Sequence, residues 1–409
     1  MKSLTLKKNE DRRIRAGHLW VFSNEIDTGR TPLKAFTAGE PAALVDSTGR
    51  SLGTVYVNPN SLIAARLVSR KAENPLNAEL IAERLRLALA WREKIYDKPY
   101  YRLIHAEGDG LPGLILDRYD DVFVAQVGTA GMEARKSALA DAILELFNPA
   151  VLLFRNDLAG RELEGLPVAP AGAAVEVAIG PAAEHLPAEI EVLEQQLVFA
   201  ASLCLGQKTG WFYDQRDSRA RAATLAAACG KGISVLDVFS YVGGFGCAAA
   251  AAAEAAQVTF LDASEGALRL AEQNARRNLP LADVRVMAGD AANLLADLRE
   301  AGQKFDLVSL DPPAFIKRKK DETAGLGAYQ RCNELALDLV AEGGLLVTSS
   351  CSQHLGLEAF RQVLARAAAR RRKTVQIVGV GRQGADHPVP PAMPELEYLK
   401  TFFLRINRT

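Results

Sequence analysis

The chain has few cysteines, and none of them forms a recognisable metal or disulfide motif. Among 409 residues there are five, and no two of them are spaced as a CxxC pair. This pattern argues against a structural zinc site, an iron–sulfur cluster and a disulfide scaffold. Unpaired cysteines are typical of a reducing compartment, so we expect a cytoplasmic protein without a metal.

The sequence also lacks a surplus of charge and a long apolar run. Its 49 Lys and Arg residues balance 49 Asp and Glu residues. A nucleic-acid partner would therefore be bound by local basic patches, because no overall positive field would attract it. The N-terminal MKSLTLKKNEDRRIR has no apolar signal segment, and no run approaches membrane-spanning length, so we expect no membrane partner.

Three parts can be distinguished along the chain. Residues 1–72 hold short strand-like runs separated by Gly and Asn-Pro turns, which predicts a small β-barrel. Residues 73–185 begin with one amphipathic helix over 75–98, in which Leu80, Leu85, Leu87 and Trp91 recur at helical spacing, and continue as a central α/β domain. The Pro-, Ala- and Gly-rich stretch 167–187 marks the boundary to a third domain, residues 186–409.

The third domain has the pattern of an α/β fold. Apolar strands are predicted at 233–239, 257–263, 283–290, 304–311 and 344–350, with helical stretches between them. Short buried strands that alternate with helices predict a doubly wound, mostly parallel sheet. The last apolar run, LEYLKTFFLRI (396–406), has no helix after it and is predicted to be an antiparallel edge strand.

Carboxylates stand at the carboxyl ends of four of these strands. They are Asp237, Asp262, Asp290 and Asp311, and the glycine turn Gly243-Gly244-Phe245-Gly246 follows the first strand. Ligands bind at this edge of open α/β sheets, so the four acids are expected in one crevice, although Asp262 alone would suit a helix N-cap. An acid-led turn without a basic residue favours a cationic ligand over a dinucleotide. S-adenosylmethionine (AdoMet) is such a ligand, with Asp262 on its ribose and Asp290 on its adenine.

The motif Asp311-Pro312-Pro313-Ala314-Phe315 predicts an acceptor site beside this crevice. The prolines stiffen the turn, Asp311 can bind an exocyclic amine, and Phe315 can stack on a base. A proline-bent loop with a core phenylalanine is the plainer interpretation. The basic run that follows favours the functional one, because it would attract phosphates; it comprises Lys317, Arg318, Lys319 and Lys320.

Several motifs together resemble the large-subunit (23S) ribosomal RNA cytosine-C5 methyltransferases. The motifs are KTGWFYDQRDSR, LDVFSYVGGFG, SLDPPAF, SSCSQH and ADHPV, and the resemblance covers essentially the whole chain. It implies an N-terminal PUA domain, a Rossmann-like class I methyltransferase domain and ribosomal RNA as partner. It also implies that a segment closes over the cofactor; the matching residues are Lys208, Thr209, Tyr213, Gln215 and Arg216. With the residues next to the acids, the candidate AdoMet site further includes Phe239, Ser240, Gly243, Gly244, Ala263 and Ala291.

The resemblance also implies that Cys351 is the nucleophile. Cys351 follows the apolar run LLVTSS at the same sheet edge as Asp311. A thiolate that adds to cytosine C6 makes C5 nucleophilic toward a sulfonium methyl group, while Asp311 binds the N3/N4 edge. A lone cysteine is more often a small core residue, and we assign that role to the other four cysteines. Many such enzymes carry a second cysteine after the Pro-Pro turn, where this chain has Ala314.

Two alternatives remain open at this point. The Asp-Pro-Pro turn is also suited to methylation of a base nitrogen, which needs no cysteine. A non-catalytic RNA-binding ribosome-assembly factor with a vestigial cofactor fold is the second, although the intact acids and glycines argue against it. The sequence leaves a homodimer open.

Overall fold

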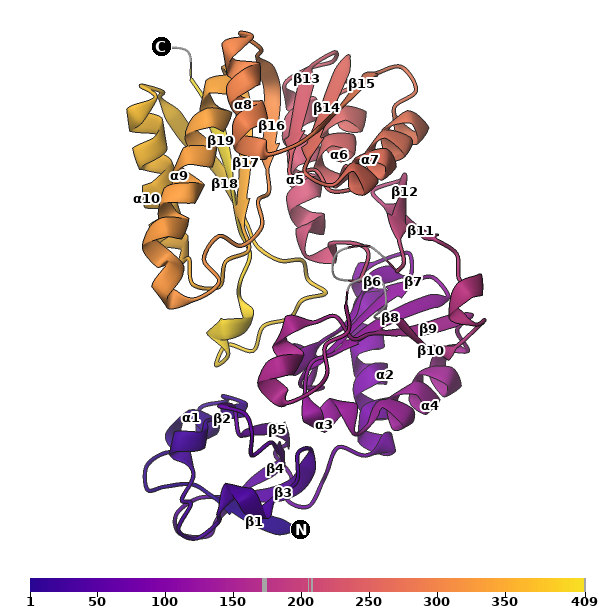
Figure 1. Cartoon of the computed structure of the whole chain (residues 1–409), viewed down its shortest axis with the longest axis vertical. Coiled ribbons are helices and arrows are strands. Elements are labelled where there is room, and N and C mark those ends of the chain that lie inside the picture. The colour runs from indigo at the N-terminus through magenta and orange to yellow at the C-terminus, as the bar shows by residue number, and fades with distance from the viewer. Residues whose placement is uncertain (171–174, 205, 207–208, 408–409) are drawn as a thin grey trace. The chain divides into compact units, whose positions relative to one another are not determined.

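A computed structural model describes residues 1–170, 175–204, 206 and 209–407 of the chain (Figure 1). Its contacts divide it into two compact units. Unit 1 comprises Met1–Ile190, Ser202–Tyr213 and Ala385–Leu396. Unit 2 comprises Glu191–Ala201, Asp214–Gly384 and Glu397–Thr409. The division into three domains at residues 72 and 185 stays a prediction. None of the helices in the described ranges is long and apolar enough to cross a membrane.

The first part of unit 1 is a small five-stranded sheet with the order β1-β3-β4-β5-β2. β1 and β3 pair in parallel, and the other pairs are antiparallel. Its strands and its one α-helix are β1 (Lys2–Thr5), α1 (Arg12–Arg15), β2 (Trp20–Val21), β3 (Glu40–Val45), β4 (Ser51–Val57) and β5 (Ala65–Ser69). Buried aliphatic residues such as Leu4, Leu44 and Val55 form its core.

The second part of unit 1 is a five-stranded sheet with the order β10-β9-β8-β7-β6 and three helices. Its elements are α2 (Ala78–Ile95), β6 (Tyr100–His105), β7 (Leu114–Tyr119), β8 (Val122–Val127), α3 (Ala130–Glu133), α4 (Lys136–Phe147), β9 (Val151–Arg155) and β10 (Val175–Ile179). The predicted helix over 75–98 is α2, and it begins where the Asn77 side chain accepts the Leu80 N–H. Leu80 and Leu85 are buried as predicted, but Leu87 and Trp91 are 57% and 50% exposed.

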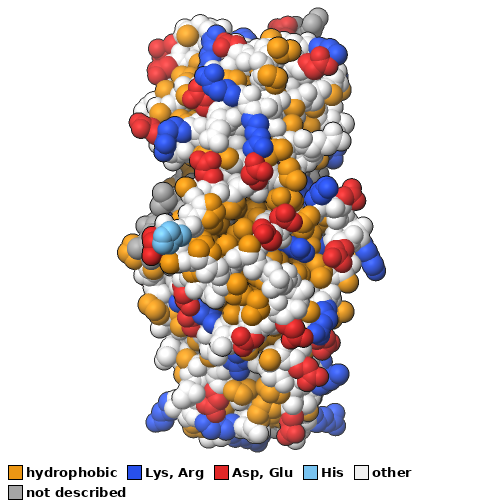
Figure 2. Space-filling model, turned by 90° about the vertical axis from the view of Figure 1, so that its right-hand side faces the viewer, with side chains coloured by type: hydrophobic (Ala, Val, Ile, Leu, Met, Phe, Trp, Pro, Cys, Tyr) orange, Lys and Arg blue, Asp and Glu red, His pale blue; other side chains and the backbone are white. Residues whose placement is uncertain are grey.

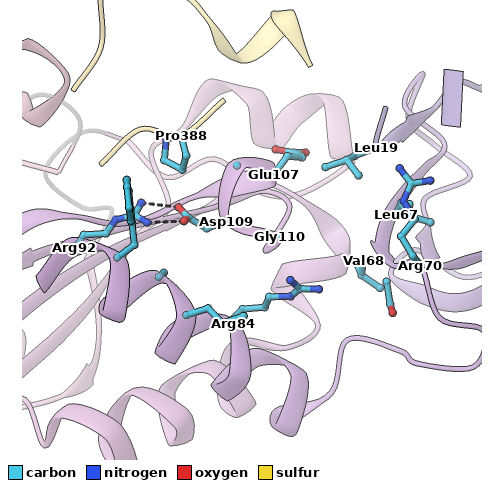
Figure 3. Close-up of a pocket in the computed structure, with 15 residues that line it drawn as sticks. Leu19, Leu67, Val68, Arg70, Arg84, Arg92, Glu107, Asp109, Gly110 and Pro388 are labelled. Atoms are coloured by element: carbon cyan, nitrogen blue, oxygen red, sulfur yellow. Dashed lines mark hydrogen bonds and ion pairs between the residues drawn. The ribbon is translucent and has the colours of Figure 1, made fainter. Parts of the chain in front are cut away.

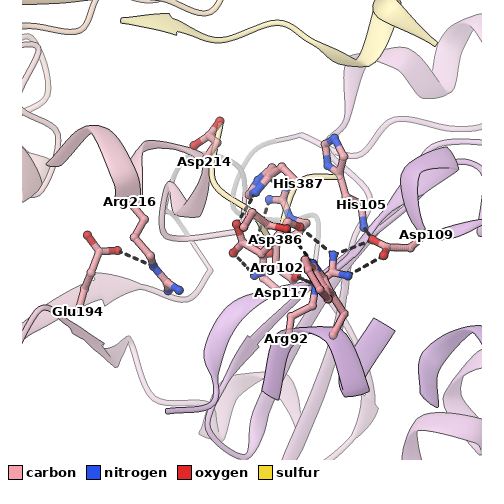
Figure 4. A network of polar contacts seen from close by, with 12 residues as sticks. Arg92, Arg102, His105, Asp109, Asp117, Glu194, Asp214, Arg216, Asp386 and His387 are labelled. Carbon is pink, nitrogen blue, oxygen red and sulfur yellow. Dashed lines mark hydrogen bonds and ion pairs between the residues drawn. The ribbon is translucent and has the colours of Figure 1, made fainter. Parts of the chain in front are cut away.

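A segment from near the C-terminus belongs to unit 1. Asp386 accepts a hydrogen bond from the Arg102 amide at 2.9 Å, and the His387 ring lies 3.1 Å from the Arg102 guanidinium (Figure 4). Arg102 also forms a buried ion pair with Asp117 at 2.6 Å. The motif ADHPV therefore packs into the central part of the chain, although it lies 200 residues beyond that part in the sequence.

Unit 2 is built on a seven-stranded sheet with the order β15-β14-β13-β16-β17-β19-β18. The five predicted strands are confirmed as β13 (Ser234–Val238), β14 (Gln257–Asp262), β15 (Asp283–Ala288), β16 (Phe305–Leu310) and β17 (Val340–Ser350), all parallel to one another. The last run is β19 (Lys400–Ile406), which is antiparallel as predicted. Its prediction as an edge strand is wrong, because β18 (Val375–Gly381) pairs with it and forms the edge. A two-stranded ribbon, β11 (Glu189–Glu194) with β12 (Leu197–Ser202), leads into this unit.

Helices cover both faces of the large sheet. They are α5 (Arg216–Ala228), α6 (Gly244–Ala252), α7 (Glu265–Asn278), α8 (Ala291–Glu300), α9 (Glu322–Leu339) and α10 (Leu357–Arg370). Leu346 packs into the core formed with α8, α9 and α10, whereas its neighbour Val347 packs against residues of α5 and α6. Successive strand residues face opposite sides, so the sheet is buried on both. Because β13 lies between β14 and β16, the strand order reverses there, and a ligand crevice is expected at the carboxyl ends of these strands.

Candidate active site

The turn after β13 has an unusual backbone. Phe239 (φ 60°), Tyr241 (φ 49°) and Gly243 (φ 86°) all adopt left-handed conformations. Residues other than glycine rarely do so, and such positions cluster at functional sites. The Ser240 hydroxyl between them is buried and has no hydrogen-bond partner among the described residues. Strain and an unsatisfied hydroxyl in one turn indicate a ligand-binding loop.

The glycines of this turn allow it to pack closely on β14. A Cβ atom at Gly246 would lie 2.5 Å from the Phe260 ring, and one at Gly243 would lie 2.9 Å from the same ring. α6 begins at Gly244, and the Gly246 N–H donates to Asp237 at 2.8 Å. These glycines thus bring the start of α6 down onto the strand ends.

Asp237 is buried beneath the turn. Its two oxygens accept hydrogen bonds from the Gly246 N–H at 2.8 Å and from the Ser309 hydroxyl at 2.6 Å. Burial raises the pKa of Asp237 to about 7, and the negative charges of Asp311 and Asp262 contribute in the same direction, against the two hydrogen bonds. The structure therefore brings these three predicted acids close enough to interact, and a bound cation would relieve their repulsion.

Asp262 and Asp290 have different local roles. Asp262 accepts the N–H groups of Tyr241 and Ser264, both at 2.9 Å, and the N-cap of α7 is Ser264, so Asp262 is not the helix cap. Asp290 is the N-cap of α8, and one of its oxygens accepts two backbone N–H groups. Ala263 is exposed after β14, and Ala291 is buried in the first turn of α8. Their contacts with AdoMet stay predictions.

The segment predicted to close over the cofactor is divided between the units. In unit 2, Gln215 is buried and donates to Asp311 at 2.9 Å, while its own side-chain oxygen has no partner among the described residues. Arg216 lies 3.5 Å from Glu194. In unit 1, Thr209 donates to Asp117, and the Tyr213 hydroxyl donates to the Arg118 carbonyl at 2.9 Å. Lys208 lies outside the described residues.

The residues at the carboxyl ends of β13, β14 and β16 fit AdoMet. A cluster of carboxylates suits the sulfonium and ammonium charges, and the Ser240 hydroxyl and the Gln215 oxygen are buried polar atoms that a polar ligand would satisfy. Within the described ranges, no group of three or more His, Cys, Asp and Glu residues is arranged to hold a metal ion.

Cys351 lies directly after β17, which pairs with β16 in the register Leu310↔Thr348. It is half-buried. The loops that follow these two strands are joined by the buried hydroxyl of Tyr329, which lies 2.9 Å from both the Ser350 and Ser352 hydroxyls. The Ser352 hydroxyl in turn accepts the Ile316 N–H at 3.1 Å. This network fixes the loop around Cys351 against the loop that contains the Asp-Pro-Pro motif.

The predicted acceptor residues are arranged along this second loop. Pro312 is buried, Pro313 is exposed, and the Phe315 ring packs on the Tyr329 ring at 4.8 Å. Lys317 and Arg318 are exposed, and Arg318 pairs with Asp321 at 3.2 Å. Stacking of Phe315 on a base and phosphate binding by the basic run stay predictions.

Lys400 is a functional candidate that no sequence motif indicates. It is buried at the start of β19, opposite Ser350, and its ammonium group donates to the Ser352 carbonyl at 2.8 Å. Burial lowers the pKa of Lys400 to about 8, although the charges of Cys351 and Glu397 oppose the shift. It lines a pocket of about 230 Å³ with residues 353 and 355–357, Arg382 and Glu397. The sequence contains one indication of a functional role for Lys400, which is a lysine within a largely apolar strand.

The fold and the residues at this sheet edge define an AdoMet-dependent methyltransferase. Residues 172–389 match the S-adenosylmethionine-dependent methyltransferase family, and residues 4–70 match PUA-like domains. The chain belongs to the family of Ribosomal RNA large subunit methyltransferase I. It is 35% identical to the protein of that name from Klebsiella pneumoniae over 98% of both chains, and 35% identical to that from Aliivibrio fischeri over 99% of both.

Solved structures share the fold. A methyltransferase in complex with S-adenosylhomocysteine and a SAM-dependent methyltransferase from Streptococcus mutans each superpose with a TM-score of 0.81 at 19% identity, over 99% of this chain and 100% of theirs. The predicted combination of a PUA-like domain with a Rossmann-like methyltransferase domain is confirmed.

Proposed function

We propose that this chain methylates C5 of a cytosine in 23S ribosomal RNA, with Cys351 as the nucleophile. The observation that carries the proposal is the position of Cys351 after β17, on the loop that Tyr329 joins to the loop of Asp311. The names of the relatives supply the class of substrate, large-subunit ribosomal RNA. We further propose that the protein acts in the cytoplasm.

The reaction follows from the chemistry of the two loops. AdoMet supplies an electrophilic methyl group when it is bound. The Cys351 thiolate adds to C6 of the cytosine, which forms a carbon–sulfur bond and moves electron density onto C5. After C5 has taken the methyl group, loss of the C5 proton to a base and departure of the thiolate restore the aromatic ring. Asp311, held by Gln215 at 2.9 Å, binds the N3/N4 edge of the base.

Lys400 supports this chemistry by stabilising the thiolate. Its ammonium group is fixed on the carbonyl of the residue after Cys351, and it is buried, so the attraction between the two charges is weakly screened. Glu397 and Arg382, which line the same pocket, pair with each other at 2.5 Å. Lys400 acts through Cys351 and is a positioning residue in this scheme.

The experiment that tests the proposal is covalent trapping. RNA with 5-fluorocytidine at the target site has no C5 proton to lose, so release should stall after methylation. With AdoMet, wild-type protein is expected to form a denaturation-resistant adduct with this RNA. Cys351→Ala should abolish both the adduct and methylation of ordinary RNA and leave AdoMet affinity within about twofold. Cys332→Ala, which changes a buried cysteine of α9, is the matched control and should still form the adduct.

The two alternatives predict other outcomes. An active Cys351→Ala enzyme, or an active wild type that forms no adduct, would overturn the C5 mechanism in favour of methylation of a base nitrogen at the Asp-Pro-Pro motif. Absence of AdoMet binding in calorimetry would instead indicate a non-catalytic assembly factor.

A further inference from the structure

Unit 1 contains a pocket of about 510 Å³ that the proposed reaction does not use. Its walls are the end of β5 with Arg70, one face of α2 and the turn Glu107–Gly110 after β6, and Leu19 and Pro388 complete the lining (Figure 3). The volume is within the range of small-molecule and cofactor sites. It is large enough for a nucleotide.

The face of α2 that lines the pocket is polar at one end and aromatic at the other. Arg84, Leu87, Ala88 and Trp91 all line it, and their spacing of three, four and seven residues places them on one side of the helix. Leu87 and Trp91 are 57% and 50% exposed, which is why they do not belong to the buried face of α2. The Trp91 indole N–H lies 3.4 Å from the Ala385 carbonyl, so the ring is held by its edge.

One of the two carboxylates of the pocket is already paired, and the other shares its arginine with Glu164. Asp109 forms a two-point ion pair with Arg92 at 2.6 and 2.7 Å. Glu107 accepts the Trp20 indole N–H at 2.7 Å and lies 3.5 Å from Arg66, which is outside the pocket lining. The lining holds three arginines, Arg70, Arg84 and Arg92, against two carboxylates, which leaves it with one net positive charge.

Both of these arginines retain donors for a ligand. Arg70 donates to the Ile14 carbonyl at 2.6 Å and forms no ion pair with a described residue. The Nε–H of Arg84 is buried without a partner among the described residues, and its guanidinium lies against Gly110, where a Cβ atom would be 3.2 Å from Nε. Figure 3 shows Arg84 reaching from α2 toward this turn. Arg84 forms no ion pair with a described residue, so its terminal N–H groups are left to donate to an anion in the pocket.

We propose that this pocket binds one nucleotide of the RNA substrate, with its phosphate on Arg70 and Arg84 and its base on Trp91. The identification of the ligand as RNA rests on the proposed function. Guanidinium groups are preferred for phosphate, and an exposed indole is a platform on which any base can stack, so the site would be tolerant of sequence. It would anchor the RNA through unit 1, while the chemistry takes place in unit 2.

The test compares variants of the full chain on opposite sides of α2. Arg84→Ala and Trp91→Ala remove the proposed contacts, and Arg86→Ala removes an exposed arginine of the same helix that does not line the pocket. The probe is a fluorescein-labelled single-stranded 23S ribosomal RNA fragment that the wild type methylates. Trp91→Ala should weaken its binding at least about fivefold, and Arg84→Ala about tenfold, with a shallower dependence on salt because one phosphate contact is lost. Arg86→Ala should change binding less than twofold.

Further readouts separate this proposal from the proposed function. Arg84→Ala should raise KM for RNA and leave kcat, AdoMet affinity and thermal stability near wild-type values. If the wild type methylates RNA but Arg84→Ala and Arg86→Ala bind it equally, with equal salt dependence, the pocket is not an RNA site. If the wild type methylates no RNA at all, the proposed function fails first.

Discussion

Asp237 combines burial with a position at the expected cofactor site. Its carboxylate is satisfied by Gly246 and Ser309, yet burial and the two neighbouring acids still hold its pKa near 7. In the ligand-free protein, the raised pKa of Asp237 lowers the free energy of unfolding. This loss of stability is absent below about pH 4, grows as pH rises, and is complete above about pH 7. A bound cation favours the ionised form of Asp237. Ionisation of Asp237 is therefore coupled to the binding of a cationic cofactor.

The expected result is that AdoMet binds more tightly as pH rises through 7. Only about a tenth of Asp237 would be ionised at pH 6, so the Kd should be up to about tenfold weaker than at pH 8. Calorimetry in two buffers of different ionisation enthalpy should show proton release at pH 6 and none at pH 8. Asp237→Asn should bind more weakly, with a flat profile, whereas Asp283→Asn, at an exposed acid that pairs with Arg285, should retain the wild-type profile. A flat wild-type profile would contradict the role of Asp237.

The proposed role of Lys400 makes a second prediction at this scale. Lys400→Met should raise the pH at which Cys351 is alkylated by iodoacetamide, because the thiolate loses its neighbouring positive charge. The rate at pH 7.5 should fall several-fold, measured on the Cys351 peptide by mass spectrometry, since Cys229 is exposed to the reagent and is not the core residue expected from the sequence. Lys231→Met, at a lysine whose side chain is 77% exposed, is the control. Equal alkylation profiles for the wild type and Lys400→Met would rule the role out.

At the scale of the elements, the sequence predicts what depends on local pattern. The five parallel strands are recognisable because each is a short apolar run followed by a polar turn, and this alone placed Asp237, Asp262 and Asp311 at one sheet edge. The sequence pattern does not show which strands pair with one another, so it did not reveal that β18 pairs with β19. The prediction of β19 as an edge strand was therefore wrong. The join between the two loops through Tyr329 was missed for the same reason, since that residue comes from the middle of α9.

A substitution that adds one methyl group tests how closely the turn after β13 packs on β14. Gly246→Ala would place its Cβ atom 2.5 Å from the Phe260 ring, so we expect a loss of about 1–3 kcal/mol in stability and a weaker affinity for AdoMet. Phe260→Leu in the same chain should restore part of both, which a double-mutant cycle would measure. Gly266→Ala is the control, because its Cβ atom would meet nothing closer than 3.9 Å inside α7, and it should be neutral or slightly stabilising. Additive effects of Gly246→Ala and Phe260→Leu would show that the ring is not what the glycine accommodates.

At the scale of the whole chain, charge is distributed without a dominant sign. Figure 2 shows Lys and Arg side chains interspersed with Asp and Glu over one face, as the zero net charge predicts. RNA must then be recognised by local groups such as those of the unit 1 pocket. The composition predicted this requirement but not the pocket, because Arg70, Arg84 and Gly110 meet only through the fold.

The first part of unit 1 is joined to the rest of that unit by buried polar contacts. Glu164 accepts hydrogen bonds from the side chains of Asn58, Ser61 and Arg66 at 2.8–3.1 Å, and from the Ala130 N–H at 3.2 Å. Removing residues 1–72 would leave Glu164 buried without these three partners. Point variants are therefore a better test of RNA binding than truncation.

The two units should respond independently to two perturbations. AdoMet at 100 times its Kd should stabilise unit 2 by about 2.7 kcal/mol, because the strand-end acids Asp237, Asp262 and Asp311 belong to that unit. Glu164→Ala should destabilise unit 1 by about 3–5 kcal/mol, because it leaves the Arg66 guanidinium buried without its main partner at 2.8 Å. Differential scanning calorimetry should resolve two transitions, one raised by AdoMet and the other lowered by Glu164→Ala. Glu162→Ala, at an exposed position two residues earlier, should move neither. A single transition that shifts with both perturbations would mean that the units unfold as one cooperative body.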